Sequence, residues 1–325
     1  MNLKRKIAAL ALSLVFVAAT VSQSFASSDA DDIKSENSEK LTVYTSFFPI
    51  YDLTKQIAGD KVNVEAFMPL NQEPHDWEPS PDDVAKLSNA NLLIVNGAGM
   101  EEWLDDLDKS IKVEIAEVND EDDLILANKD EEEHDHEDED ESDKDHDHEH
   151  EGGKYDPHTW LSPVEGVKMV EKISDALAKI DEKNKEYYEK NAKKIADELN
   201  NLTKEYKEKF KKTGTDMFIV PHTAFSYLSR DFNLKQVPLT GLLTNGEPDM
   251  DSMRKVIDVI KENKIKTAFF ERGGSSKAAE TIAAETGVDV KPIATMEFIS
   301  DDEIDNVHYQ DIMKENLEMI YEAVK

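Results

Sequence analysis

The chain has 325 residues, enough for two domains of ordinary size, and 39% of them are hydrophobic, so we expect a packed core. Its formal net charge of −33 attracts cations and repels nucleic acid and anionic lipid, which excludes a nucleic-acid-binding function. Cysteine is absent, which excludes disulfides, thiolate metal ligands and cysteine nucleophiles, so any metal site must use His, Asp and Glu.

The first 26 residues have the features of a secretory signal peptide. A basic start at 4–6 is followed by a 15-residue apolar run, 7–21, and by small residues at the two positions that signal peptidase reads. Because a membrane-spanning helix needs roughly 20 apolar residues, cleavage is favoured over a retained anchor. Residues 27–39 are polar and predicted to be disordered.

From residue 40 the sequence predicts alternating strands and helices. The predicted strands are 41–45, 62–67, 92–96 and 113–116, and the predicted helices are 50–58, 81–90 and 101–108. Such alternation indicates βαβ units with a mostly parallel sheet, here in a first α/β lobe, 40–163. This lobe contains an insertion, 119–154, in which residues 130–151 comprise 15 acidic residues, five histidines, one serine and one lysine. Since these side chains cannot fill a core, we predict a solvated insertion.

A helical linker, 164–212, is expected to follow. Pro163 can open a first helix that runs to about residue 180, and Asp181 can cap a second of some 30 residues. One apolar stripe runs down this second helix, formed by Ala192, Ile195, Leu199, Leu202, Tyr206 and Phe210. The length suits a rigid strut between two lobes; the alternative is a coiled-coil dimer helix.

A second α/β lobe is predicted over 213–325. Its predicted strands are 217–220, 236–239, 267–270 and 290–293, and its predicted helices are 224–229, 250–263, 275–286 and 309–323. The sequence therefore predicts two α/β lobes with mostly parallel four-stranded sheets, joined by a long rigid helix. A cleft between such lobes is a common ligand site.

Three of the four histidines outside the insertion share one context. His75, His158 and His222 each follow a proline at the end of a strand or loop and precede a predicted helix, which is where open α/β sheets bind ligands. A single Pro-His pair is usually a turn residue, but three matched pairs favour a metal site. His308 lacks this context and is predicted to lie at the surface or at a helix start.

Three neutral imidazoles favour Zn²⁺, Cu²⁺ or Ni²⁺ over Mg²⁺ and Ca²⁺, which prefer oxygen ligands. One carboxylate would complete a zinc tetrahedron. The nearby aromatic residues Trp77, Trp160 and Phe225 are candidates for an apolar shell that orients the rings.

Five motifs in order resemble the zinc and manganese solute-binding proteins of ABC importers, which include ZnuA-type proteins. The resemblance extends from about residue 41 to the C-terminus and rests on Thr45–Tyr51, Pro74–Pro81, Asn96–Leu104, Asp156–Pro163 and Pro221–Leu228. It implies two α/β lobes bridged by a stiff helix, with the metal in the cleft between them.

The resemblance also implies a ligand set: His75, His158 and His222, with a carboxylate that matches Glu297. Glu271 is the competing carboxylate, although Arg272 beside it offers an ion pair instead. Histidine at the third position indicates a zinc-type rather than a manganese-type member.

The function implied is an extracytoplasmic, high-affinity zinc receptor that captures Zn²⁺ and delivers it to a membrane permease and its ATPase, acting as a monomer and not as an enzyme. A zinc hydrolase is disfavoured because four protein ligands leave no position for water and no His-Glu-x-x-His helix is present. A manganese receptor, a zinc-buffering protein and an adhesin are the remaining alternatives.

The insertion resembles the His-rich loop of zinc-type members, so its histidines are candidates for weak secondary zinc binding; the alternative is a solvated acidic loop. They are His134, His136, His146, His148 and His150. Gram-positive members are generally anchored through a lipidated cysteine. Because this chain has none, we expect an exported protein that is periplasmic, or extracellular at the cell surface.

Overall fold

The structure is a computed structural model, and it describes residues 40–107, 111–127, 153–242 and 248–325. All of them belong to one compact unit, Lys40–Lys325. The predicted signal peptide, the stretch 27–39 and the five histidines of the insertion lie outside the described residues. Within the described ranges, no helix combines the length and the apolar character needed to cross a membrane.

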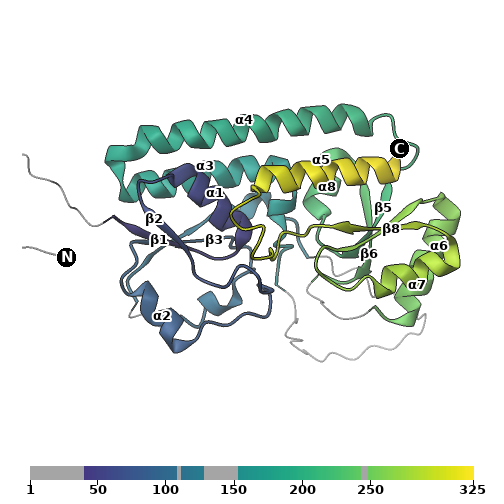
Figure 1. Ribbon diagram of the computed structural model, residues 1–325, viewed down its shortest axis with the longest axis horizontal. Helices are drawn as coiled ribbons and strands as arrows, with labels where there is room; N and C mark the ends of the chain where they lie inside the picture. Colours follow the sequence, from purple (N-terminus) through teal and green to yellow (C-terminus); the bar gives the residue numbers. More distant parts are fainter. Residues whose placement is uncertain (1–39, 108–110, 128–152, 243–247) are drawn as a thin grey trace, which may run out of the picture. The chain divides into compact units, whose positions relative to one another are not determined.

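Two four-stranded sheets organise the protein (Figure 1). The first has the order β2-β1-β3-β4 and consists of β1 (Thr42–Thr45), β2 (Asn63–Ala66), β3 (Leu92–Val95) and β4 (Glu114–Glu117). The second has the order β6-β5-β7-β8 and consists of β5 (Met217–His222), β6 (Lys235–Thr240), β7 (Thr267–Glu271) and β8 (Asp289–Ile293). Their strand pairs are all parallel, which confirms the predicted α/β fold class.

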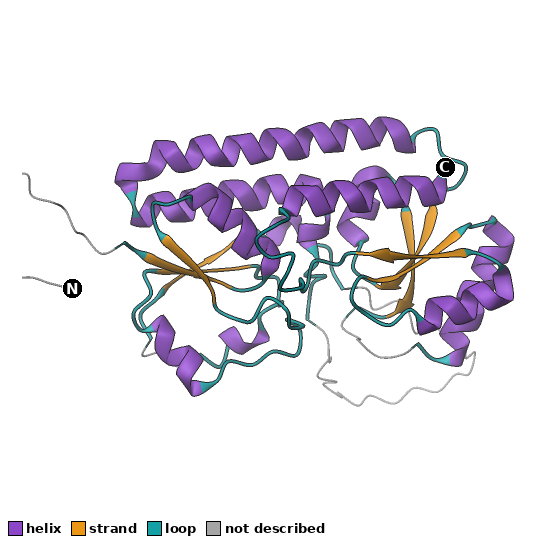
Figure 2. Ribbon diagram, viewed as in Figure 1, coloured by secondary structure: helices purple, strands orange, loops and turns teal. Residues whose placement is uncertain are grey.

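Helices cover the faces of both sheets (Figure 2). They are α1 (Phe48–Ala58), α2 (Pro81–Leu87), α3 (Pro163–Ile180), α4 (Lys185–Phe210), α5 (Ser226–Phe232), α6 (Met250–Asn263), α7 (Lys277–Thr286) and α8 (Tyr309–Val324). Because helices enclose the sheets, the inner strand β3 is a continuous apolar run, Leu-Leu-Ile-Val, in which all four residues are buried.

Several helices begin where a side chain caps them. Ser80 and Asp83 form a capping box at α2, and the Ser162 hydroxyl accepts a hydrogen bond from the backbone N–H of Val164 at α3. Pro163 occupies the first turn of α3, where its missing N–H costs nothing. These local signals explain why the first residues of both helices match the prediction.

α4 runs alongside α3 and extends above both sheets (Figure 1). Its buried stripe comprises Tyr188, Ala192, Ile195, Ala196, Leu199, Tyr206 and Phe210. These residues join one apolar cluster that also contains Val43 of β1, Phe218 of β5 and Leu317 of α8. The hydrophobic core is therefore continuous from the first sheet, through α4, to the second.

The prediction for α4 was wrong in two details, its start and its length. Asp181 does not cap α4, because the 3₁₀ turn Glu182–Asn184 intervenes and α4 begins at Lys185; the Asp181 carboxylate instead accepts hydrogen bonds from Asn184 Nδ2 (2.7 Å) and the Tyr188 hydroxyl (2.6 Å). α4 thus has 26 residues rather than some 30.

The helix predicted over 101–108 is only a 3₁₀ turn, Glu102–Leu104. The buried Glu101 carboxylate accepts backbone hydrogen bonds from Asn96 and Gly97 (2.8 and 2.9 Å). It therefore folds back onto the preceding turn instead of starting a helix. The helix predicted at 224–229 is α5, two residues further along.

A buried carboxylate joins α1 of the first lobe to the start of α8. Asp52 accepts hydrogen bonds from the Tyr309 backbone N–H (2.7 Å), from Gln56 Nε2 (2.7 Å) and from His308 Nδ1 (3.0 Å). His308 is the N-cap residue of α8, as the helix-start prediction states. Because the carboxylate also lies at the positive end of α8, the contact stabilises the junction electrostatically.

Asp52→Ala is expected to lower the free energy of unfolding by about 2–4 kcal/mol, because three hydrogen bonds to one buried carboxylate are lost and their donors lose their acceptor. Urea unfolding followed by circular dichroism measures the change. Asp305→Ala is the matched control: Asp305 pairs with Lys55 of the same helix α1 (3.1 Å), but its side chain is 79% exposed, so little change is expected. Equal destabilisation by both substitutions would contradict the assignment.

Candidate metal centre

Four candidate ligands predicted from the sequence meet between the carboxyl ends of the two sheets. His75 lies in the loop between β2 and α2, and His158 directly precedes the 3₁₀ turn Thr159–Leu161. His222 is the last residue of β5, and Glu297 follows β8 after three intervening residues. Parallel strands place their ends at one edge, so each sheet presents its ligands toward the other.

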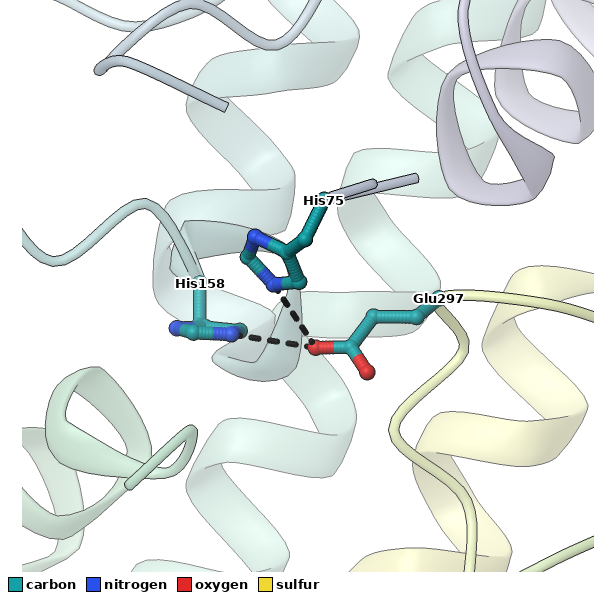
Figure 3. Close-up of side chains that lie close together, drawn as sticks. All are labelled: His75, His158 and Glu297. Carbon is teal, nitrogen blue, oxygen red and sulfur yellow. Dashed lines mark ion pairs between the residues drawn. The ribbon is translucent and has the colours of Figure 1, made fainter. Parts of the chain in front are cut away.

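The three imidazoles converge on one carboxylate oxygen. Glu297 Oε1 lies 3.0 Å from His158 Nε2, 3.2 Å from His222 Nε2 and 3.5 Å from His75 Nε2. Figure 3 shows two of these imidazoles, those of His75 and His158, pointing their ring nitrogens at this oxygen. His158 and Glu297 are fully buried, and His222 is nearly so.

These buried atoms lack ordinary hydrogen-bond partners. Within the described residues, His75 Nε2, His158 Nε2 and Glu297 Oε2 have no partner of acceptable geometry, although the first two lie close to Glu297 Oε1. Burying such atoms unpaired is costly. Nitrogen lone pairs and a carboxylate aimed at one point fit a small cation with borderline-soft ligand preferences.

His158 is held by a second carboxylate. Asp156 Oδ1 lies 2.8 Å from His158 Nδ1 and also accepts a hydrogen bond from the His158 backbone N–H (3.0 Å). This contact leaves Nε2 as the nitrogen that faces Glu297, the arrangement that outer carboxylates give to metal-binding histidines. The Trp160 ring packs against His158, with ring centroids 5.1 Å apart.

The other two aromatic residues predicted to surround the site pack elsewhere. Trp77 contacts Phe67 and Trp103 (ring centroids 5.4 and 5.7 Å apart), and Phe225 contacts Phe218 (6.1 Å). Their rings fill the cores of the two lobes, because large apolar surfaces near a strand end are drawn into the nearest core.

Hydrogen bonds on both sides hold the segment that carries Glu297. Trp160 Nε1 donates to the Thr295 carbonyl oxygen (2.7 Å), and the Asn316 side chain bonds both the N–H and the carbonyl of Ala294 (3.1 and 2.7 Å). Met296 has a φ of +62°, which costs a non-glycine residue roughly 1 kcal/mol. This strained turn aims the next side chain, Glu297, back toward the first lobe.

The charged groups at the centre shift the pKa values of both His158 and Glu297. Burial alone would lower the pKa of His158, but the hydrogen bond to Asp156 and the close negative charges of Asp156 and Glu297 raise it to about 9. Burial alone would raise the pKa of Glu297, but the charge of His222 and the close approach of all three imidazoles hold it well below its usual range. In the metal-free protein the centre therefore retains a proton that a bound cation would replace.

Glu271, the competing carboxylate, lies beside this centre. Its ligand oxygen is within 4.8 Å of those of His222 and Glu297, and it accepts a hydrogen bond from the Thr295 hydroxyl. Arg272 does not pair with it, as the sequence suggested, but with Glu303 (3.6 Å) and Glu315 (2.5 Å). The side chains of residues 271 and 272 point in opposite directions, as neighbours at a strand end do.

Glu73 is a residue that the sequence reasoning missed. It immediately precedes Pro74-His75, and burial together with the charges of Glu297 and Glu271 raises its pKa to about 8. Burial and the charge of Glu297 likewise raise the pKa of Glu271 to about 7. The sequence signal that could have identified Glu73 is its position directly before a Pro-His motif.

Known proteins match almost the whole described chain. The family described as the periplasmic zinc-uptake complex component A, ZnuA, matches residues 43–323. The high-affinity zinc uptake system protein ZnuA of Bacillus subtilis is 40% identical over 287 residues, which cover 88% of each chain. The laminin binding protein Lmb of Streptococcus agalactiae, described as an adhesin with metal transporting activity, has a TM-score of 0.75 at 33% identity and covers 88% of this chain and 100% of its own. The Zn(II)-bound ZnuA-like domain of Streptococcus pneumoniae AdcA has a TM-score of 0.70 at 33% identity, with 88% and 99% covered.

In the metal-free protein we expect the His158 ring to titrate near pH 9, and Asp156→Asn to lower this midpoint because one of its two carboxylate partners loses its charge. Since this pKa lies above the usual 6.5, the protonated ring stabilises the fold fully below pH 6.5 and loses that effect as the pH rises through about 9. Ring-proton chemical shifts followed by NMR measure the midpoint. A wild-type midpoint below 6.5 would contradict the role of both carboxylates.

Proposed function

We propose, since the chain belongs to the ZnuA family of zinc-uptake complex components, that it binds Zn²⁺ tightly outside the cytoplasm and delivers it to a membrane importer. The observation that carries this proposal is the convergence of three imidazoles, from both lobes, on one oxygen of Glu297. Zn²⁺ is the cargo of the protein and not a resident cofactor.

The proposed ligands are His75, His158, His222 and Glu297. Three neutral nitrogens and one carboxylate oxygen form a four-ligand set that suits tetrahedral Zn²⁺. The imidazoles lie directly around the carboxylate oxygen; a cation among them would take over that attraction and replace a proton held at His158.

The nitrogen-rich set supports zinc over manganese, the closest alternative. Mn²⁺ prefers oxygen ligands and stands at the weak end of the divalent affinity series. With His222 as the third nitrogen, only Glu297 offers a hard oxygen in the proposed set. A closed set of four protein ligands also leaves no position for a reactive water, which supports a binding protein and not a hydrolase.

We further propose that the segment 1–26 directs export, that the mature protein acts as a monomer in the periplasm or at the cell surface, and that its partners are a permease and an ATPase. The family description and the zinc-uptake relative support this placement. Adhesion is a second candidate function, on the ground that the streptococcal relative is described as both an adhesin and a metal transporter.

His222→Ala should weaken zinc binding by more than the ~10–100-fold that loss of an outer-shell partner costs, because a direct ligand is removed. Competition between the protein and a chromogenic zinc chelator measures the affinity. His308→Ala is the control, since His308 caps α8 and lies outside the proposed ligand set. Retention of wild-type affinity by His222→Ala would refute the ligand assignment.

Deletion of residues 130–151 should remove only weak zinc binding and leave one tight site per chain. The five histidines of this segment are all outside the proposed set of four ligands. Calorimetric titration of the deletion variant beside the full chain separates the two classes. If tight binding disappears with the segment and survives His222→Ala, the protein is a zinc buffer that uses the insertion.

A further inference from the structure

A cavity of about 430 Å³ borders the proposed zinc centre on the side of the second lobe. Its ionisable lining residues are His222, Glu271, Glu73 and Asp76, and most of the others are apolar, such as Phe270 and Ala279. His222 is thus shared between the cavity and the proposed ligand set.

The carboxylates at this cavity become more buried toward the zinc centre. Asp76 is exposed, Glu73 and Glu271 are partly buried, and Glu297 is fully buried. The first three line the cavity, and Glu297 lies behind them, close to Glu271, so a cation that enters from solvent meets carboxylate oxygens before it reaches Glu297. Divalent cations exchange water for carboxylate oxygens one at a time, so such a series lowers the cost of dehydration.

No basic side chain among the described residues neutralises the partly buried carboxylates. Glu271 accepts a hydrogen bond from the Thr295 hydroxyl, and Glu73 accepts a long one from the His75 backbone N–H (3.4 Å). The nearby Arg272 is engaged by Glu303 and Glu315. No basic partner therefore competes with a mobile cation for these carboxylates, and a cation that displaces their protons meets both as oxygen ligands.

Two residues that line this cavity, His222 and Glu271, belong to a second group of ligand atoms. The ligand atoms of His222, Glu271 and Glu297 lie within 4.8 Å of one another, which makes them a possible metal-binding group distinct from His75, His158 and Glu297. Glu297 Oε2 is buried without a hydrogen-bond partner, while Oε1 faces the three histidines. Glu297 thus has a second, unpartnered oxygen that is free to bind a cation.

We infer that His222, Glu271 and Glu297 form a transient divalent-cation site, with Glu73 at its rim, through which Zn²⁺ enters the tight site; this rests on the proposed function. Zn²⁺ binds first to His222, Glu271 and Glu297 and keeps some of its water. It then moves to Glu297 Oε1 and the nitrogens of His75 and His158, while His222 stays bound. Glu271 releases it at the end of the transfer.

A site that Zn²⁺ occupies only transiently changes the rates of association and dissociation but not the equilibrium affinity. Glu271→Gln keeps the size of the side chain and an acceptor for the Thr295 hydroxyl but removes the carboxylate that the cation would bind. It should slow both the association and the dissociation of Zn²⁺ by about tenfold, within the range known for electrostatically assisted entry. Because both directions pass the same intermediate, the dissociation constant should change less than about threefold.

Stopped-flow tryptophan fluorescence of the full chain measures both rates, because Trp160 packs on His158. Association is followed with Zn²⁺ alone, and dissociation after mixing with excess chelator. Glu285→Gln is the matched control: it removes one negative charge from an exposed position on α7 of the same lobe, and should leave both rates unchanged.

Unchanged rates in Glu271→Gln would overturn the inference. So would faster dissociation with a weakened affinity, because Glu271 would then be a ligand of the tight site. His158→Ala, measured in parallel, tests the proposed function itself: loss of the tight phase in this variant supports the zinc centre whatever Glu271→Gln does. If the tight phase survives in His158→Ala, both the proposed zinc centre and the proposed entry site are refuted.

Discussion

The buried carboxylate of Glu297 constrains which groups the rest of the structure must place around it. A fully buried negative charge is tolerated only where compensating groups surround it. Three imidazoles supply that compensation. Any two of these four residues are between 64 and 222 residues apart in the sequence. Side chains from both lobes therefore converge on a single oxygen.

Holding these side chains around one oxygen requires a rigid framework. The continuous apolar cluster through α4 joins the two sheets, and the Asp52 carboxylate ties α1 to the start of α8. The strained backbone at Met296 is held by the bonds of Trp160 and Asn316 to its neighbours. Because these contacts cross between the lobes, we expect metal capture to involve small local shifts and not a wide rotation of the lobes.

The chemistry of the two ligand groups differs in a way that suits capture followed by retention. The inner set proposed here is rich in nitrogen, which holds zinc strongly, whereas the cavity beside it is rich in oxygen, which exchanges ligands readily. Glu297 belongs to both groups, and its burial excludes competing water. A highly acidic chain then favours the approach of any cation, while the nitrogen set selects which cation stays.

The α/β class, the parallel sheets and most helix starts could be predicted from the sequence, because they depend on short-range features: alternating apolar runs, Ser80 and Ser162 as caps, and Pro163 in a first turn. The three Pro-His motifs could be recognised as one set for the same reason. The failures arose where a distant contact overrides the local pattern, as at Glu101, which bonds the preceding turn, and at Asp181, which bonds Tyr188.

What only the tertiary structure decided was which atoms face one another. Glu271 ends β7 and Glu297 lies four residues past the end of β8, so both stayed candidates in the sequence, where the resemblance favoured Glu297. In the fold, Glu297 reaches the three imidazoles, and Glu271 faces the cavity with Glu73, a residue that carries no motif of its own. The sequence alone determined the kinds of ligand present, since residue type sets chemistry, but distances across two lobes depend on packing that no local pattern encodes.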